Sequence, residues 1–292
     1  MPKITFFVEA PQKWVNPEER TEDKERTQYI REMLYQEYGE ETVLSYLAKK
    51  EYSLAIATGI LDKKYAELIK DINHAGVLVT HWIVVDDNQG YWTNACSLEA
   101  TKDKIEKLLN WQRKYNLGLA KVGLDIEWPL QVARAFSSND FARGLRLFWE
   151  YRKNIPKNAQ EEFEKLLQLL RVKATPVQFY EFPKILGWFF PSGLKIPKNA
   201  EVVEMDYSSM LPKILVLLLM KVFRSKKRIP ALGIINGVSE ETPGRMLGPQ
   251  LPRHLTAEDL RKDIEAVGQQ DEIYLFALNG VKVIDLLEEA IA

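Results

Sequence analysis

Cysteine and histidine are scarce in this sequence. The 292 residues include one cysteine, Cys96, and three histidines. A single cysteine excludes an internal disulfide and a cysteine-rich zinc site. With so few histidines, a metal centre would depend on carboxylate ligands, which suit Mg or Mn. We therefore expect no resident metal or cofactor, with Mg or Mn as the alternative.

Net charge and long apolar runs are also missing. Forty basic against 41 acidic residues give a net charge of -1, so the chain has no electrostatic footprint for a nucleic acid. The most apolar run, Ile214 to Met220, holds seven residues before Lys221, whereas a membrane span needs about 20. We expect no nucleic-acid partner and no transmembrane segment. The amino terminus lacks a signal-peptide pattern, so we expect a cytoplasmic protein, with export as the alternative if a leader preceded this sequence.

Eight short β-rich runs alternate with helical patterns along the chain. The predicted strands are Ile4–Glu9, Ser53–Thr58, Val77–Val85, Val122–Glu127, Val177–Glu181, Val202–Tyr207, Leu232–Asn236 and Ile273–Leu278. Eight strand–helix units in a chain of this length predict a closed (β/α)8 barrel, a single domain over residues 1–292. An open doubly wound sheet is the alternative, but neither G-x-G-x-x-G after the first strand nor G-x-x-x-x-G-K-[ST] is found.

The helical patterns lie between these strands. The predicted helices include Thr27–Lys50, Leu61–Asn73, Leu98–Tyr115, Leu130–Arg152, Gln160–Arg171, Pro212–Lys227 and Ala257–Val267. Thr256 and Asp259 resemble a capping box at the start of the last of these.

Polar and aromatic residues collect where the predicted strands end, which is where barrel enzymes build their sites. The expected substrate-binding residues are Glu9, His81, Trp82, Trp128, Glu181, Asp206, Asn236 and Arg245. Arg245 belongs to a Gly- and Pro-rich loop, Ser239–Pro252. We interpret this loop either as a lid over the site or as an ordinary surface loop. Four of the seven tryptophans, Trp82, Trp92, Trp128 and Trp188, have loop positions that suit sugar stacking. For Trp14, Trp111 and Trp149 we expect packing.

The segment Lys121–Pro129 carries the clearest chemical pattern. Asp125 and Glu127 are spaced i, i+2, which places them on one face of a strand. Two neighbouring carboxyls resist joint ionisation, so the pKa of one should rise. A carboxyl group with a raised pKa beside an aromatic ring can act as the general acid that protonates a glycosidic oxygen.

These residues resemble the signature of the family-18 glycoside hydrolases, which include chitinases and endo-N-acetylglucosaminidases. In that family the fourth strand ends in D-G-x-D-x-D-x-E, followed by an aromatic residue and Pro, and this chain matches the final part at Asp125-Ile-Glu127-Trp128-Pro129. Gly123 replaces the family's middle Asp and Ala120 its first. On the sixth strand the family has M-x-Y-D, where this chain reads Met205-Asp-Tyr207-Ser208. The family's eighth-strand Trp is missing near Phe276–Leu278.

The resemblance implies hydrolysis of a carbohydrate with retention, in which the N-acetyl group of the substrate attacks the anomeric carbon. Glu127 would be the general acid/base, Asp125 would orient the acetamido group, and Tyr207 would hydrogen-bond its carbonyl oxygen. Asp206 or Glu181 would supply the charge of the missing upstream acids.

Two other functions fit the same strand ends. Glu127, Glu181, Asp206 and His81 offer a ligand set for a divalent-metal-dependent sugar isomerase or lyase. The departures from the family signature favour, as a third reading, a non-catalytic barrel that binds glycans. The oligomeric state is open.

Overall fold

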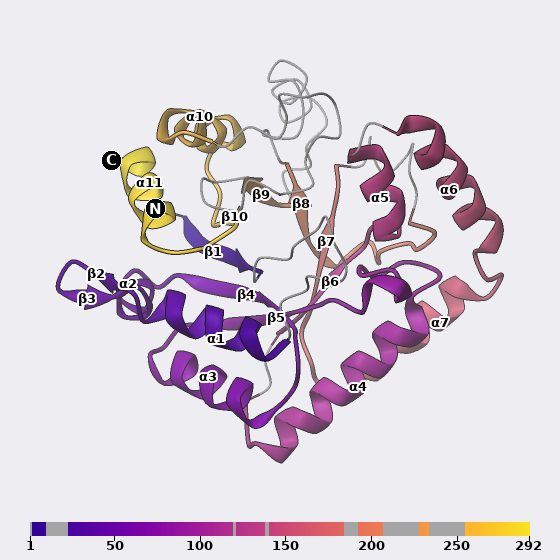
Figure 1. The fold of residues 1–292 in the computed structure, drawn as a ribbon, viewed down its shortest axis with the longest axis horizontal. Helices are drawn as coiled ribbons and strands as arrows, with labels where there is room; N and C mark the ends of the chain where they lie inside the picture. Colours follow the sequence, from indigo (N-terminus) through magenta and orange to yellow (C-terminus); the bar gives the residue numbers. More distant parts are fainter. Residues whose placement is uncertain are drawn as a thin grey trace.

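The barrel predicted from the sequence is present. The computed structural model of the protein describes residues 2–9, 23–118, 121–137, 140–183, 192–206, 228–233 and 255–292. Within these ranges eight strands form a closed barrel in the order β1, β4, β5, β6, β7, β8, β9, β10, and β10 pairs with β1. All eight strand pairs are parallel. Figure 1 shows the strands converging at the centre of the molecule with helices around them.

Each of the eight predicted strands overlaps an observed one. The observed strands are β1 (Lys3–Val8), β4 (Ser53–Ala57), β5 (Val79–Ile83), β6 (Lys121–Asp125), β7 (Val177–Glu181), β8 (Glu201–Met205), β9 (Ile229–Gly233) and β10 (Glu272–Phe276). The fold is thus a closed (β/α)8 barrel, and the doubly wound alternative is excluded.

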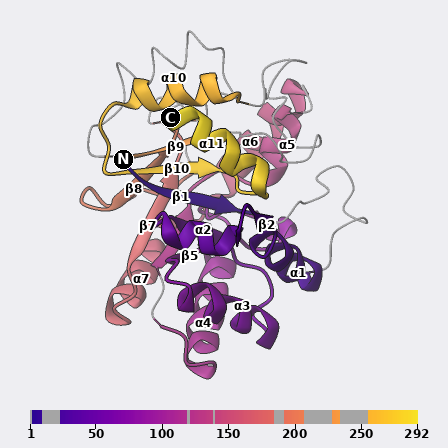
Figure 2. The same cartoon turned by 90° about the vertical axis from the view of Figure 1, so that its left-hand side faces the viewer.

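Described helices follow β1, β4, β5, β6, β9 and β10 along the chain and lie outside the strands, as the turned view in Figure 2 also shows. They are α1 (Asp23–Leu34), α2 (Val43–Lys49), α3 (Lys63–His74), α4 (Leu98–Lys114), α5 (Leu130–Ser137), α6 (Phe141–Asn154), α7 (Ala159–Val172), α10 (Ala257–Val267) and α11 (Val281–Ile291). The capping box predicted at Thr256 and Asp259 is present at the start of α10. In the described ranges no helix combines the length and apolarity that a membrane crossing needs.

Two of the predicted helices are broken. The pattern Thr27–Lys50 is interrupted by a two-stranded hairpin, β2 (Glu37–Tyr38) and β3 (Glu41–Thr42). Gly39 supplies its turn with a φ of 63°, which glycine adopts readily. The pattern Leu130–Arg152 is divided into α5 and α6, and Asp140 caps α6 by accepting from the backbone N–H of Arg143. The predicted helix Pro212–Lys227 lies outside the described residues.

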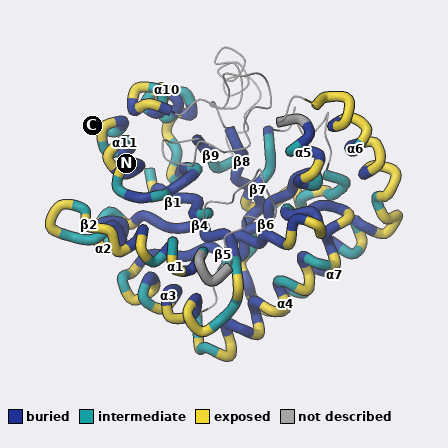
Figure 3. The backbone as a smooth tube through the Cα atoms, viewed as in Figure 1, coloured by how far each residue is buried: buried dark blue, intermediate teal, exposed yellow. Residues whose placement is uncertain are grey.

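Two apolar layers hold the barrel together. The larger layer lies between the strands and the surrounding helices, and the smaller one fills the barrel interior. Figure 3 shows the strands and the inward helix faces buried, with exposure confined to the outer surface. Side chains alternate between these layers along each strand, so the residue parity decides which layer a side chain joins.

Candidate functional site

Aromatic rings fill the middle of the barrel. Phe7 contacts Trp82, Tyr180 and Tyr274, with ring centroids 5.3, 4.9 and 5.3 Å apart. Gly123 on β6 makes room for one of these rings, because a Cβ there would lie 2.6 Å from Cε2 of Tyr180. Tyr180 therefore fills the space beside the position where the family-18 signature has its middle Asp.

Three carboxyl groups stand above these rings, at the carboxyl ends of the strands. Asp125 ends β6 on the same face as Gly123, and Glu127 follows two residues later. Backbone bonds extend the pairing past β6: Thr93 N–H donates to Asp125 O at 2.8 Å, and Glu127 N–H donates to Thr93 O at 3.2 Å. Glu9 follows β1 on the face of Phe7. We call Glu9, Asp125 and Glu127 the carboxyl cluster.

Burial raises the pKa of every member of the carboxyl cluster. The pKa of Asp125 rises to about 8, mainly through burial, while contacts with Glu127 and Trp82 oppose the rise and the charge of Glu9 adds to it. The pKa of Glu127 is raised well above its usual value by burial and then by the charge of Asp125. The pKa of Glu9 rises to about 7, again through burial. Protonated carboxyls are thus available near neutral pH.

The loop after β5 supports the carboxyl cluster. The Tyr91 hydroxyl donates a hydrogen bond to Glu9 Oε1, and Val85 N–H donates to Tyr91 O at 2.9 Å, which folds the loop back on itself. Tyr91 takes a φ of 63°, an uncommon value for a non-glycine residue. On the same loop Asp87 accepts a hydrogen bond from Arg134 of α5 at 2.8 Å. The Tyr91–Glu9 hydrogen bond and the Arg134–Asp87 ion pair therefore hold the loop beside the carboxyl cluster.

Polar atoms without partners mark this point of the barrel. Among the described residues, Asp125 Oδ1 and the Tyr180 hydroxyl are buried and have no hydrogen-bond partner. The two residues are opposite each other in the β6–β7 register. A buried polar atom left unpaired is costly, so it commonly marks a place for a ligand or a bound water.

His81 does not join the carboxyl cluster. Its neighbour Trp82 points into the barrel, so His81 points outward to the helices, where it contacts Tyr65 and Trp111. The Tyr65 hydroxyl lies 3.4 Å from His81 Nδ1. Burial lowers the pKa of His81 to about 4, which keeps the imidazole neutral. The assignment of His81 to substrate binding is therefore corrected: its side chain packs between barrel and helices.

Glu181 is also placed away from the carboxyl cluster. Glu181 lies on the outer face of β7 with Phe179, whose ring packs against Phe163 of α7, and it forms an ion pair with Arg228. Asp206 is buried just after β8, where its N–H donates to Glu204 O at 2.9 Å. Beyond burial and the mutual effect of the pair, the further charge that raises the pKa values of Asp125 and Glu127 comes from Glu9, a role for which the sequence indicated Asp206 or Glu181.

The expected sugar-stacking tryptophans have different surroundings. Trp82 lies within β5 and is buried in the barrel beside Asp125. Trp128 is buried and stacks on Phe182 with ring centroids 5.7 Å apart, so its face is not open to a sugar in this structure. Trp111 is buried as expected, whereas Trp149 is 55% exposed, which contradicts the expected packing. Tyr207, Asn236, Arg245, Trp14 and Trp188 lie outside the described residues.

The ligand set considered for a divalent metal is not assembled. His81 faces the helices and Glu181 faces Arg228, while Glu127 lies in the carboxyl cluster. In the described part of the chain no group of three or more His, Cys, Asp or Glu side chains has an arrangement that holds a metal ion.

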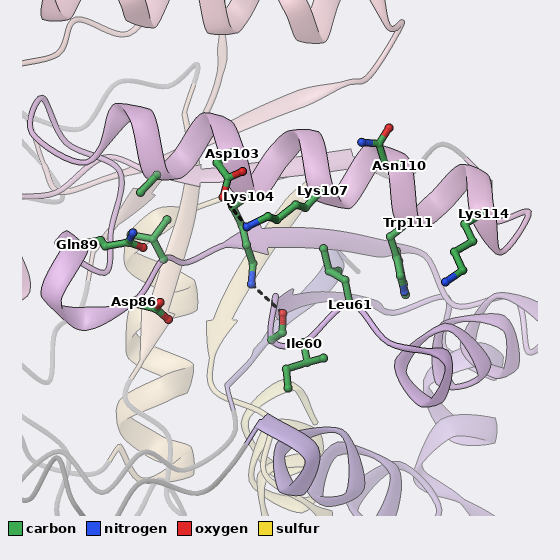
Figure 4. A pocket seen from close by; sticks show the side chains of 13 residues that line it. Ile60, Leu61, Asp86, Gln89, Asp103, Lys104, Lys107, Asn110, Trp111 and Lys114 are labelled. Atoms are coloured by element: carbon green, nitrogen blue, oxygen red, sulfur yellow. Dashed lines mark hydrogen bonds and ion pairs between the residues drawn. The ribbon is translucent and has the colours of Figure 1, made fainter.

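A groove of about 530 Å3 opens beside the barrel mouth, between the turn after β4 and one face of α4 (Figure 4). Lys104 Nζ crosses it and donates to Gly59 O at 2.8 Å, and Lys107 pairs with Asp103 at 2.6 Å. No member of the carboxyl cluster is among its lining residues. The groove is a separate feature, and its Lys104 and Lys107 are held by bonds within the protein.

Comparisons with known proteins give neighbours in fold. No family model matches the sequence, and no curated protein matches it. Among solved structures, a GH18 chitinase from Pseudoalteromonas aurantia aligns at 12% identity over 98% of this chain and 99% of its own, with a TM-score of 0.43. A D-tagatose 3-epimerase-like protein aligns at 11% identity over 82% and 88%, with a TM-score of 0.45. A D-psicose 3-epimerase aligns at 11% identity over 97% of this chain and 89% of its own, with a TM-score of 0.40.

Proposed function

We propose that this protein is a glycoside hydrolase that acts on a saccharide containing N-acetylglucosamine, with Glu127 as the general acid/base. The observation that carries the proposal is the buried Asp125–Glu127 pair at the carboxyl end of β6, in which both pKa values are raised. A carboxyl that keeps its proton near neutral pH is the group that protonates a glycosidic oxygen.

The proposed reaction divides the work between the two carboxyls. Glu127 gives its proton to the leaving oxygen while the carbonyl oxygen of the substrate's acetamido group attacks the anomeric carbon. Asp125 hydrogen-bonds the acetamido N–H and holds it in position. Water then attacks the anomeric carbon of the cyclised intermediate, and Glu127 takes the proton back from that water. Tyr207 is the proposed donor to the acetamido oxygen, on the resemblance of its motif alone.

Glu9 takes a place in this proposal that the signature gives to an upstream acid. Tyr180 occupies the space beside Gly123, so no carboxyl fits two residues before Asp125. The charge of Glu9 instead raises the pKa of both Asp125 and Glu127 from across the barrel. Glu9 would thereby keep the shared proton on the pair at the pH where the acid must act.

The test uses an activated aryl glycoside of the N-acetylglucosamine dimer. We expect hydrolysis that EDTA leaves unchanged and that a thiazoline mimic of the cyclised intermediate inhibits. Activity that EDTA destroys and Mg or Mn restores would overturn the proposal in favour of metal chemistry. Retained binding of the N-acetylglucosamine oligomer without turnover would identify the barrel as a glycan-binding protein.

A further inference from the structure

Helix α6 presents large apolar side chains to the solvent. Phe141, Leu145 and Trp149 are spaced four residues apart and are 50%, 47% and 55% exposed. This spacing places them along one face of the helix. The adjoining side of α6 is packed against the protein, where Phe148 and Tyr151 join the cluster formed with α5 and Trp128. Figure 1 shows α6 on the outside of the molecule, and Figure 3 shows its outer length exposed.

The exposed side chains form a ridge and are not scattered. The described residues include seven exposed large apolar side chains, and three of the seven lie on this one face of α6. Single exposed apolar residues are ordinary on a protein surface, whereas a contiguous row indicates a docking surface. Neither the carboxyl cluster nor the groove beside α4 uses this face.

Cations border the ridge on its solvent-exposed side. Helix α6 contains Arg143, Arg146, Arg152 and Lys153, all exposed, against the single acid Glu150. The Arg152 guanidinium lies 5.4 Å from the centre of the Trp149 ring, so a cation sits on the ridge itself. The one ion pair within the helix, Arg146 with Glu150, is long at 4.0 Å and exposed, which leaves Arg146 available to another anion.

We propose that α6 docks the protein on an anionic lipid surface. Phe141, Leu145 and Trp149 would enter the boundary between headgroups and acyl chains, and the arginines and Lys153 would meet lipid phosphates or carboxylates. An apolar face with a basic border is the pattern of a helix that lies in a membrane interface. A second copy of the chain fits this face less well, because it would bring two sets of like charges together, whereas anionic headgroups neutralise them. The proposal does not depend on the glycosidase activity.

The test is co-sedimentation of the full-length protein with vesicles. We expect the protein to bind phosphatidylcholine vesicles that contain phosphatidylserine, to bind pure phosphatidylcholine much more weakly, and to dissociate as salt is raised. The double variant Leu145→Ser/Trp149→Ser should lower the partition coefficient about tenfold or more. Both side chains are exposed, so the variant should keep the melting temperature of the wild type.

Matched variants distinguish binding through this face of α6 from nonspecific binding to vesicles. Val172→Ser, which removes a 74% exposed apolar side chain from α7, should bind like the wild type. Arg146→Gln/Lys153→Gln should lose the preference for phosphatidylserine. Equal binding of the wild type and the Leu145→Ser/Trp149→Ser variant, or no binding of the wild type to anionic vesicles, would overturn the proposal. Lipid-free dimerisation that the same double variant abolishes would overturn it in favour of a second copy.

Discussion

The Tyr91 hydroxyl donates a hydrogen bond to Glu9, a residue 82 positions earlier in the chain. This contact joins the loop after β5 to the end of β1 on the opposite side of β4. It lowers the pKa of Glu9 against the larger effect of burial. Tyr91 makes the contact from a left-handed backbone conformation, a cost that local structure alone does not explain.

Removing this hydroxyl should perturb Glu9. In Tyr91→Phe the Glu9 carboxylate loses a buried donor, so its pKa should move upward from about 7. The free energy of unfolding should fall by about 1–3 kcal/mol, because Glu9 is left without this partner. Titration of the Glu9 carboxyl by carbon-13 NMR checks the first effect, and chemical denaturation checks the second. A downward shift of the pKa would show that the hydroxyl does not stabilise the Glu9 anion.

The raised pKa values also set how stability depends on pH. Glu9 and Asp125 are raised from 4.5 to about 7 and from 3.8 to about 8. The stability that these two carboxyls contribute is fully present below their unfolded pKa values and is lost as pH rises through their folded pKa values. Above the unfolded pKa values, the unfolded chain has released protons that the folded chain still holds. His81 is lowered from 6.5 to about 4, so its opposite effect is confined to pH values below 6.5.

We therefore expect the free energy of unfolding to fall as pH rises from 6.5 to about 8. The slope should reach up to about 1.4 kcal/mol per pH unit for each carboxyl that titrates. Urea denaturation at several pH values measures it. Asp125→Asn should flatten the slope, while Glu106→Gln, an exposed acid on α4, should keep it. Stability that rises over this range would contradict the assigned pKa values.

Gly123 gives a separate test of the packing below the carboxyl cluster. Gly123→Ala places a Cβ 2.6 Å from Cε2 of the buried Tyr180 ring, so the ring or the strand must shift. We expect a loss of about 1–3 kcal/mol in the free energy of unfolding. Gly118→Ala is the matched control, because no heavy atom lies within 4 Å of its added Cβ. Similar effects of the two substitutions would show that Tyr180 does not depend on Gly123.

The barrel could be predicted from the sequence because its signals are local. Each strand is a short β-rich run bounded by turn residues, and the alternation with helices fixes the parallel topology. The helix pattern Thr27–Lys50 misled because its apolar period continues through Gly39, where a positive φ turns the chain. The helical spacing of apolar residues carries no information on that turn, although Gly39 itself was a signal for it.

The candidate site was predictable in part. Asp125 and Glu127 are two residues apart on one strand, so their common face follows from strand geometry. His81 and Trp82 are adjacent on a strand that is buried on both faces, so the sequence does not tell which of them points inward. The partnership of Glu9 with Asp125 and Glu127 joins β1 to β6 across the barrel, and only closure of the barrel brings them together. The contact of Tyr91 with Glu9 was not predicted. Gly90, which marks a turn directly before Tyr91, was the signal for it in the sequence.

The most direct measurement of the central claim is the hydrolysis rate of Glu127→Gln beside the wild type. The substrate is the activated aryl glycoside of the N-acetylglucosamine dimer, and folding is monitored by circular dichroism. The amide keeps the shape of the side chain but has no proton to give to the leaving oxygen. We expect the rate to fall about 100- to 10,000-fold with the fold intact, while Glu106→Gln keeps the wild-type rate. A Glu127→Gln enzyme that turns over as fast as the wild type would remove Glu127 from the mechanism.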